Sequence, residues 1–233
     1  MNDFLRNNFY SFKEEIEDIA IKCGRDYKSI KVVAVSKNFP SKYIQTLYEC
    51  GQRDFGENRA QEMINKYEEL NGYDINWHFI GTIQTNKIRR IVQMADYIHS
   101  VWRLKEIEEI QKRAESINKI QKIFLEVNVS GEETKAGLKP SEVEDFVTEV
   151  MELNSFGNIE IIGLMTMAPY TNDENILRKT FSDLRQIKDK LQSRYDTIRE
   201  LSMGMSNDYK IAIEEGATYL RIGTRLFGER KYN

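Results

Sequence analysis

Short apolar runs alternate with longer amphipathic segments along most of the chain. The runs predict eight β-strands, at residues 31–37, 53–56, 77–81, 97–101, 122–129, 159–167, 198–203 and 218–222. The intervening segments have apolar residues at helical spacing, which predicts helices with one buried face. Residues 173–194 are an example, with Leu177, Phe181, Leu184, Ile187 and Leu191 on one face.

The residues before the first predicted strand also form a helical pattern. It is carried by Phe9, Phe12, Ile16, Ile19 and Cys23. Strands that alternate with helices favour a parallel sheet covered by helices, and eight strands are the number that closes a (β/α)8 TIM barrel. We therefore expect an α/β barrel preceded by an extra N-terminal helix. An open doubly wound sheet is the alternative, but its G-x-G-x-x-G fingerprint does not follow the first predicted strand.

Length and composition fit one barrel domain. The chain has 233 residues, close to the roughly 250 typical of this barrel. Its three prolines, Pro40, Pro140 and Pro169, lie outside any Pro/Gly/Ser-rich linker, and no segment is of low complexity. We therefore predict a single domain over residues 1–233.

Charge and cysteine usage exclude several classes of protein. The net charge of −3 gives no broad cationic surface for nucleic acid. The two cysteines, Cys23 and Cys50, form no C-x-x-C motif, which suits a reducing compartment. The first residues lack the apolar core of a signal peptide, and no run approaches the ~18 apolar residues of a membrane span. We expect a cytoplasmic protein without a membrane, nucleic-acid or metal partner.

The first predicted strand ends at a lysine. In "VVAVSK", Val33, Val35 and Lys37 share a face, because successive strand side chains alternate. If that face is the barrel interior, burial lowers the pKa of the amine and makes it a nucleophile toward aldehydes. The structural alternative is a lysine that reaches solvent or pairs with an acid such as Glu57.

The next strand ends offer side chains with both structural and functional interpretations. Asn58 of "FGEN" is more consistent with a helix cap than with a ligand contact. His78 of "WHFIG" is more consistent with a hydrogen-bonded core residue than with a catalyst. Met165 of "GLMTM" is interpreted first as packing. The loop after Asn128, "SGEETKAG", is either a lid or a long turn.

The last two strands predict an anion site. "LSMGMSND" turns at Gly204 and supplies Ser206, and "LRIGTRLFG" supplies Gly223 and Thr224 just after the eighth strand. Phosphate sites recur after strands seven and eight of this barrel. Arg221 shares a strand face with Gly223, so its guanidinium is expected to point into the barrel, where it needs an acceptor.

An amine at strand one, a phosphate site at strands seven and eight, and an arginine nearby suit a phosphorylated aldehyde. Pyridoxal 5′-phosphate meets that description. Its aldehyde would bond to Lys37, its phosphate would lie at Ser206, Gly223 and Thr224, and its ring nitrogen would accept from Arg221.

Several stretches, in order and over nearly the whole chain, resemble the pyridoxal phosphate homeostasis proteins, a family related to the N-terminal barrel of alanine racemase. They are "VVAVSK", "FGENRAQE", "WHFIGTIQTNK", "VNVSGEETKAG", "GLMTM", "LSMGMSNDYKIAIEEGAT" and "RIGTRLFG". The resemblance implies a barrel of the fold-type III class, with Lys37 as the Schiff-base lysine. It also implies phosphate contacts at Ser206, Gly223 and Thr224, and Arg221 at the pyridine nitrogen.

The same resemblance assigns further residues to the surroundings of the cofactor: Asn58, His78, Met165, Ser202 and Met203. Two positions depart from the family, which often has histidine at Thr82 and aspartate at Trp102. Both departures concern the rim of the expected pocket.

The function implied by the resemblance is that of a carrier. It would hold pyridoxal phosphate on Lys37 and supply it to pyridoxal-phosphate-dependent apo-enzymes. The alternatives are an amino-acid racemase and a Schiff-base aldolase of the same barrel class. A racemase needs a second proton-transfer group, which alanine racemase takes from a second domain, and here only "GTRLFGERKYN" follows the last predicted strand. We therefore expect a carrier rather than a dedicated enzyme, and a monomer.

Overall fold

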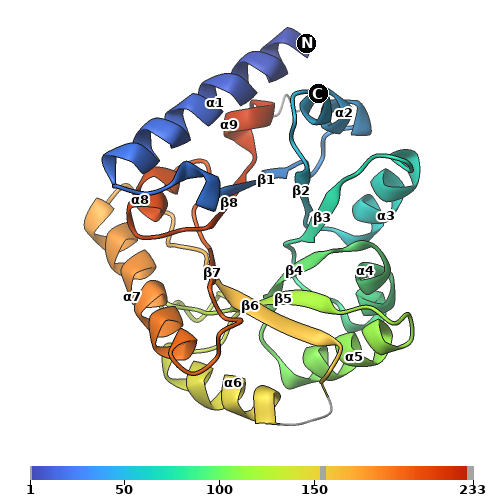
Figure 1. The fold of residues 1–233 in the computed structure, drawn as a ribbon, viewed down its shortest axis with the longest axis vertical. Coiled ribbons are helices and arrows are strands. Elements are labelled where there is room, and N and C mark those ends of the chain that lie inside the picture. Colours follow the sequence, from blue (N-terminus) through green and yellow to red (C-terminus); the bar gives the residue numbers. More distant parts are fainter. Residues whose placement is uncertain (1, 153–155, 230–233) are drawn as a thin grey trace.

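The computed structural model describes residues 2–152 and 156–229 and is a closed barrel of eight parallel strands (Figure 1). The strands are β1 Lys31–Val35, β2 Asp54–Glu57, β3 Asn76–Phe79, β4 Tyr97–Val101, β5 Gln121–Glu126, β6 Ile159–Met165, β7 Glu200–Ser202 and β8 Tyr219–Ile222. They follow one another around the barrel in chain order, and β8 pairs with β1. The predicted TIM-barrel fold is confirmed. Each strand overlaps its predicted run, and β2, β3 and β5 each reach one residue beyond it at one end.

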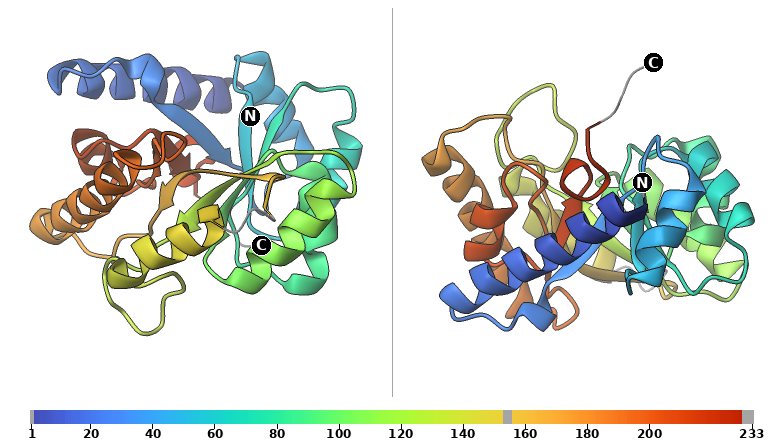
Figure 2. Two further views of the ribbon diagram at one scale, coloured as in Figure 1. Left: turned by 60° about the horizontal axis from the view of Figure 1, so that its bottom comes forward. Right: turned by 90° about the horizontal axis from the view of Figure 1, so that it is seen from above.

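Helices surround the barrel, as the two side views show (Figure 2). They are α1 Asn2–Lys22, α2 Ser41–Glu49, α3 Ala60–Glu69, α4 Ile88–Met94, α5 Leu104–Glu115, α6 Val143–Glu152, α7 Glu174–Gln192, α8 Tyr209–Glu214 and α9 Thr224–Phe227. Short 3-10 turns occupy Tyr27–Ser29, Thr85–Lys87 and Pro140–Glu142. The predicted domain of residues 1–233 also includes residues 1, 153–155 and 230–233, which lie outside the described residues.

The predicted N-terminal helix is present and packs beside α2, α8 and α9 (Figure 1). Its buried face consists of Leu5, Phe9, Phe12, Ile16 and Ala20. The sequence pattern extended this face to Cys23, which is exposed because the helix ends at Lys22 and the chain turns at Gly24. The helix therefore covers the side of the barrel where the first and last strands meet.

The core has two parts, one between the strands and the helices and one inside the barrel. The interior apolar cluster consists of Val33, Phe124, Ile162, Met165 and Tyr219, with Tyr97 packed against it. The alternate residues of the same strands, such as Ala34, Leu125 and Leu220, belong to the outer cluster. Along a regular strand, successive side chains therefore point alternately toward the barrel interior and toward the helices.

The close approach of β6 and β7 depends on a glycine. A Cβ placed on Gly163 would lie 2.0 Å from the carbonyl oxygen of Glu200, which is backbone and cannot move aside without opening the strand pair. We predict that Gly163→Ala lowers the free energy of unfolding by about 3 kcal/mol or more. Urea denaturation measures this change.

Gly157→Ala is the matched control, because a Cβ there meets no atom within 4 Å. It should change the free energy of unfolding by less than about 0.5 kcal/mol. Equal stability of the two variants would contradict the assignment of Gly163 to a steric constraint.

Candidate functional site

A pocket of about 660 Å³ opens at the carboxyl ends of the strands. Its lining contains six of the predicted site residues: Lys37, Asn58, Ser206, Arg221, Gly223 and Thr224. They come from the ends of β1, β2, β7 and β8, and barrel closure brings β1 next to β8. The amine, the arginine and the predicted phosphate-site residues therefore share one cavity.

Four other predicted residues do not line this pocket. Met165 lies in the interior apolar cluster, and His78 and Ser202 are fully buried and hydrogen-bonded inside the barrel. Met203 packs in the outer cluster, on the opposite side of the strand from Ser202. The structural interpretation of His78 as a hydrogen-bonded core residue agrees with this placement.

Lys37 lies two residues beyond Val35, the last residue of β1, and keeps the direction that the strand gives it. Val33 belongs to the interior cluster, and Val35 and Lys37 line the pocket, as alternation predicts. Lys37 is half-buried and begins a turn in which Asn38 has a positive φ of 64°. The Asn38 N–H donates to Glu62 Oε1 at 2.5 Å, so the turn is anchored to α3.

A second lysine, Lys66, stabilises this turn through a hydrogen bond to its backbone. The buried Lys66 ammonium donates to the Ser36 carbonyl oxygen at 2.7 Å, to Glu57 Oε1 at 2.6 Å and to Glu62 Oε1 at 2.8 Å. Ser36 Oγ also donates to Glu57 Oε1, at 2.6 Å. Glu57, the acid suggested as a structural partner of Lys37, is thus the partner of Lys66. Burial raises the pKa of Glu57, and the positive charge of Lys66 opposes that rise.

Asn58 is in the pocket lining, and the prediction that it caps the following helix is wrong. The N-cap of α3 is Arg59. The backbone of Gly81 instead approaches that of Asn58 closely, because a Cβ on Gly81 would lie 2.0 Å from the Asn58 carbonyl oxygen. This close approach of the segments after β2 and β3 leaves the Asn58 side chain at the cavity wall.

Arg221 is a buried cation between several acceptors. Its Nη1 donates to Ser202 Oγ at 2.7 Å, and its Nη2 donates to the Thr166 carbonyl oxygen at 2.8 Å. Burial lowers the pKa of the guanidinium to about 10, and the charges of Asp208 and Glu126 oppose this shift. The group therefore keeps its proton at neutral pH and presents a fixed positive charge to the pocket.

Two acidic side chains also line the pocket, Glu126 from the end of β5 and Asp208 from the segment before α8. Burial raises the pKa of Glu126 to about 7, and Arg221 opposes that rise while Glu106 adds to it. Burial likewise raises the pKa of Asp208, whose Oδ1 accepts from the Met205 N–H at 2.5 Å. Glu126 therefore gains or loses a proton near neutral pH.

The predicted phosphate residues form one wall of the pocket. Ser206 follows the turn at Gly204, whose φ is 93°, and its Oγ accepts from the Arg225 N–H at 3.4 Å. Gly223 and Thr224 begin α9. Both α8 and α9 are very short, so the case for an anion here depends on the hydroxyls and backbone of this wall rather than on a helix dipole.

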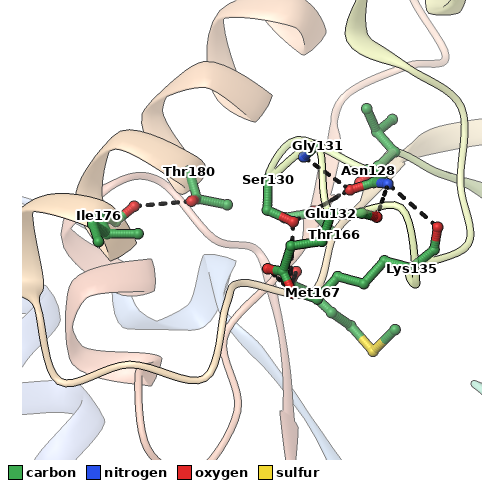
Figure 3. A network of polar contacts seen from close by, with 10 residues as sticks. Asn128, Ser130, Gly131, Glu132, Lys135, Thr166, Met167, Ile176 and Thr180 are labelled. Atoms are coloured by element: carbon green, nitrogen blue, oxygen red, sulfur yellow. Dashed lines mark hydrogen bonds and ion pairs between the residues drawn. The ribbon is translucent and has the colours of Figure 1, made fainter.

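The loop after β5 is an ordered turn around Asn128 (Figure 3). Asn128 Nδ2 donates to the carbonyl oxygens of Glu132 at 2.9 Å and Lys135 at 3.3 Å, and its Oδ1 accepts from the Gly131 N–H at 3.1 Å. Lys135 Nζ donates to the carbonyl oxygen of Met167, a pocket residue, at 3.5 Å. The long-turn interpretation of this segment fits its internal hydrogen bonds.

The sequence did not point to Ser100, Glu126 and His99. Glu126 could have been found by alternation, because it is two residues after the interior Phe124. Ser100 and His99 could not, because the register of β4 against β5 shifts between Ile98 and Val101. After this irregularity, two consecutive residues are both buried, His99 against interior rings and Ser100 at the pocket.

Comparison with known proteins places the chain in a family. The family model "Alanine racemase, N-terminal domain" matches residues 22–231. The pyridoxal phosphate homeostasis protein of Aquifex aeolicus is 44% identical over 220 residues, which are 94% of this chain and 95% of that protein. The protein of the same name from Escherichia coli K12 is 34% identical over 100% of this chain and 99% of its own length. The chain belongs to the pyridoxal phosphate homeostasis protein family.

Solved structures agree with this assignment. PipY of Synechococcus elongatus PCC7942, with pyridoxal phosphate bound, is 35% identical with a TM-score of 0.79, over 91% of this chain and 99% of that one. An alanine racemase of Clostridium difficile 630 shares the fold, with 18% identity and a TM-score of 0.76, over 99% of this chain but 58% of the racemase. The resemblance to this family that the motifs indicated is confirmed.

The two departures from the family pattern have different positions. Thr82 lines the pocket, whereas Trp102 packs against the outer cluster and under the Arg103 guanidinium, which lies 5.0 Å from the Trp102 ring centroid.

Within residues 2–152 and 156–229, no helix combines the length and apolar character needed to cross a bilayer. The same residues contain no cluster of histidine, cysteine and acidic side chains suited to a metal ion.

The Lys66–Glu57 pair gives a test of the support behind Lys37. Lys66→Met should lower the free energy of unfolding by about 3–5 kcal/mol, because it leaves the Glu57 carboxylate buried without its cation. The double variant Glu57→Gln with Lys66→Met should recover more than half of that loss. Urea denaturation at neutral pH measures both, and a double variant as unstable as the single one would argue against a charge-based cause.

Glu126 gives a test that depends on pH. Its folded-state pKa of about 7 exceeds the ordinary value of 4.5, so its contribution to stability is fully present below pH 4.5 and is lost as the pH rises through 7. Glu126→Gln should therefore be more stable than the parent at pH 8, by at most about 3 kcal/mol, and nearly equal to it at pH 5. Thermal or urea unfolding of both proteins at the two pH values measures the difference. A constant difference at both would contradict the assignment.

Proposed function

We propose that this protein holds pyridoxal 5′-phosphate as a Schiff base on Lys37 and supplies it to apo-enzymes within the cell. The observation that carries the proposal is the meeting of three groups in one cavity. The Lys37 side chain, the Arg221 guanidinium and the wall of Ser206, Gly223 and Thr224 all line the same pocket. These are the groups that an aldehyde, a ring nitrogen and a phosphate require.

The covalent step needs no further reactant. The neutral Lys37 amine adds to the aldehyde carbon, and one water leaves as the carbon–nitrogen double bond forms. The turn that carries Lys37 is held by Lys66 and by Glu62, so the amine starts from a fixed backbone position. The reverse reaction with water or with another amine releases the cofactor, which is what a supply function needs.

The phosphate and the ring are proposed to use the other side of the pocket. Ser206 Oγ and the backbone at Gly223 and Thr224 offer donors without burying a further cation. Arg221 offers N–H groups to the ring nitrogen while Ser202 and the Thr166 carbonyl hold the guanidinium in place. Because arginine does not give up its proton, the ring nitrogen would remain an unprotonated acceptor.

A carrier is favoured over an amino-acid racemase. The relatives that match this chain over nearly their full length are named pyridoxal phosphate homeostasis proteins. An unprotonated ring nitrogen is also a weaker electron sink, which disfavours removal of an α-proton. We propose further that the protein is a monomer and that it is cytoplasmic. Its free Cys23 and Cys50 support the second point, because they suit a reducing compartment.

Lys37→Ala tests the covalent assignment. The parent protein loaded with pyridoxal phosphate should show a near-visible absorption band that borohydride removes, and the reduced cofactor should be found on Lys37 by peptide mass spectrometry. The variant should lose the band and the adduct, because it lacks the amine. Lys42→Ala, which alters an exposed lysine in α2, should keep both.

Each alternative has its own outcome in the same assays. A reducible band that survives in Lys37→Ala would reject Lys37 as the anchor. Rapid racemisation of alanine by the loaded protein would favour the racemase. Borohydride trapping of a sugar phosphate in place of the cofactor would favour the aldolase.

A further inference from the structure

A chain of buried polar side chains crosses the barrel interior beneath the pocket. Ser202 Oγ lies 2.8 Å from His99 Nδ1, His99 Nε2 lies 2.9 Å from His78 Nδ1, and His78 Nε2 lies 3.0 Å from Asp54 Oδ1. At its upper end, Arg221 Nη1 donates to the same Ser202 oxygen at 2.7 Å. The chain thus begins at the start of β2 and ends at a pocket residue.

The two ends of this chain fix the direction of every hydrogen bond in it. An ionised Asp54 carboxylate only accepts, so His78 Nε2 carries a proton and donates. In a neutral ring the other nitrogen accepts, so His78 Nδ1 accepts from His99 Nε2–H, and His99 Nδ1 accepts from the Ser202 hydroxyl. The Ser202 oxygen then offers its lone pairs to Arg221, which only donates.

Burial supports the neutral state of both rings. His78 and His99 are fully buried, and burial lowers the pKa of each, with Asp54 opposing the shift at His78 and the charge of Arg221 adding to it at His99. Aromatic rings enclose them: Tyr97 is stacked on His78 at 4.5 Å and Phe124 on His99 at 4.3 Å, measured between centroids. Neither ring can turn without disrupting this packing.

We propose that Asp54, His78, His99 and Ser202 form a directional relay that orients Arg221 for the cofactor ring. This rests on the proposed function, because it assigns positioning roles at the same site. None of these four residues lines the pocket, and Asp54 and the two histidines act on Arg221 through Ser202. Because the Ser202 hydroxyl donates its proton to His99, its oxygen can only accept from Arg221. This keeps the guanidinium in one orientation toward the pocket.

The histidine tautomers provide a test that needs no cofactor. The chain contains only these two histidines, so a ¹⁵N-correlated spectrum of the imidazole nitrogens has two ring systems. Both rings should be neutral with the proton on Nε2 at pH 7. A doubly protonated His78, or a proton on Nδ1 of His99, would reverse the chain and overturn the proposal.

The loaded protein provides the second test. Ser202→Ala removes the acceptor for Arg221 and should speed cofactor dissociation on the order of tenfold and shift the absorption maximum. Ser202→Thr, which keeps the hydroxyl, should restore the parent values. Phe124→Leu is the control, because it changes the packing on His99 without removing a relay hydrogen bond, and its absorption maximum should match that of the parent.

A double variant separates a positioning role from a structural one. His99→Phe should shift the absorption maximum in the parent but cause no further shift in Ser202→Ala, because His99 acts through Ser202. Additive shifts would overturn the relay. If the parent binds no cofactor, the proposed function fails, whereas a parent that binds and a Ser202→Ala variant with an unchanged spectrum and dissociation rate would reject the relay alone.

Discussion

The burial of Arg221 inside a closed barrel constrains the rest of the site. A guanidinium keeps its proton, and its transfer from water costs several kcal/mol unless acceptors replace the water. Here the acceptors are Ser202 from β7 and the Thr166 carbonyl after β6, with Glu126 from β5 and Asp208 as nearby negative charges. These groups are far apart in the sequence, and closure of the barrel is what brings them around one cation. The pocket floor therefore depends on the topology as a whole.

The sequence left two interpretations of Lys37: a reactive amine in the pocket, or a lysine that reaches solvent or pairs with an acid such as Glu57. Lys66 is buried and donates hydrogen bonds to Glu57, Glu62 and the Ser36 carbonyl oxygen. Lys37 lines the pocket at the end of the turn that Lys66 supports. Glu57, the acid named as an example of a partner for Lys37, thus binds an amine that α3 supplies.

Alternation along regular strands predicted the direction of several side chains. Val33, Val35 and Lys37, and likewise Tyr219, Arg221 and Gly223, lie where a period of two places them. Prediction failed where the backbone departs from that period or where packing decides. The irregularity in β4 turns both His99 and Ser100 inward, and the contact of Gly81 with Asn58 holds that residue at the wall. Neither the register shift in β4 nor the close approach of Gly81 to Asn58 leaves a signal in the local sequence.

The polar interior is better suited to holding a cofactor than to turning over a substrate. Racemisation needs groups that exchange protons with the substrate carbon, on both faces. In the proposed relay each proton lies between two fixed partners, and the chain ends at an arginine that does not release its own. Such an arrangement would give the ring nitrogen a constant donor, and the relay itself would give the substrate no mobile proton. Together with the proposed Lys37 bond to the aldehyde, which would form and break with water alone, it favours reversible storage of the cofactor.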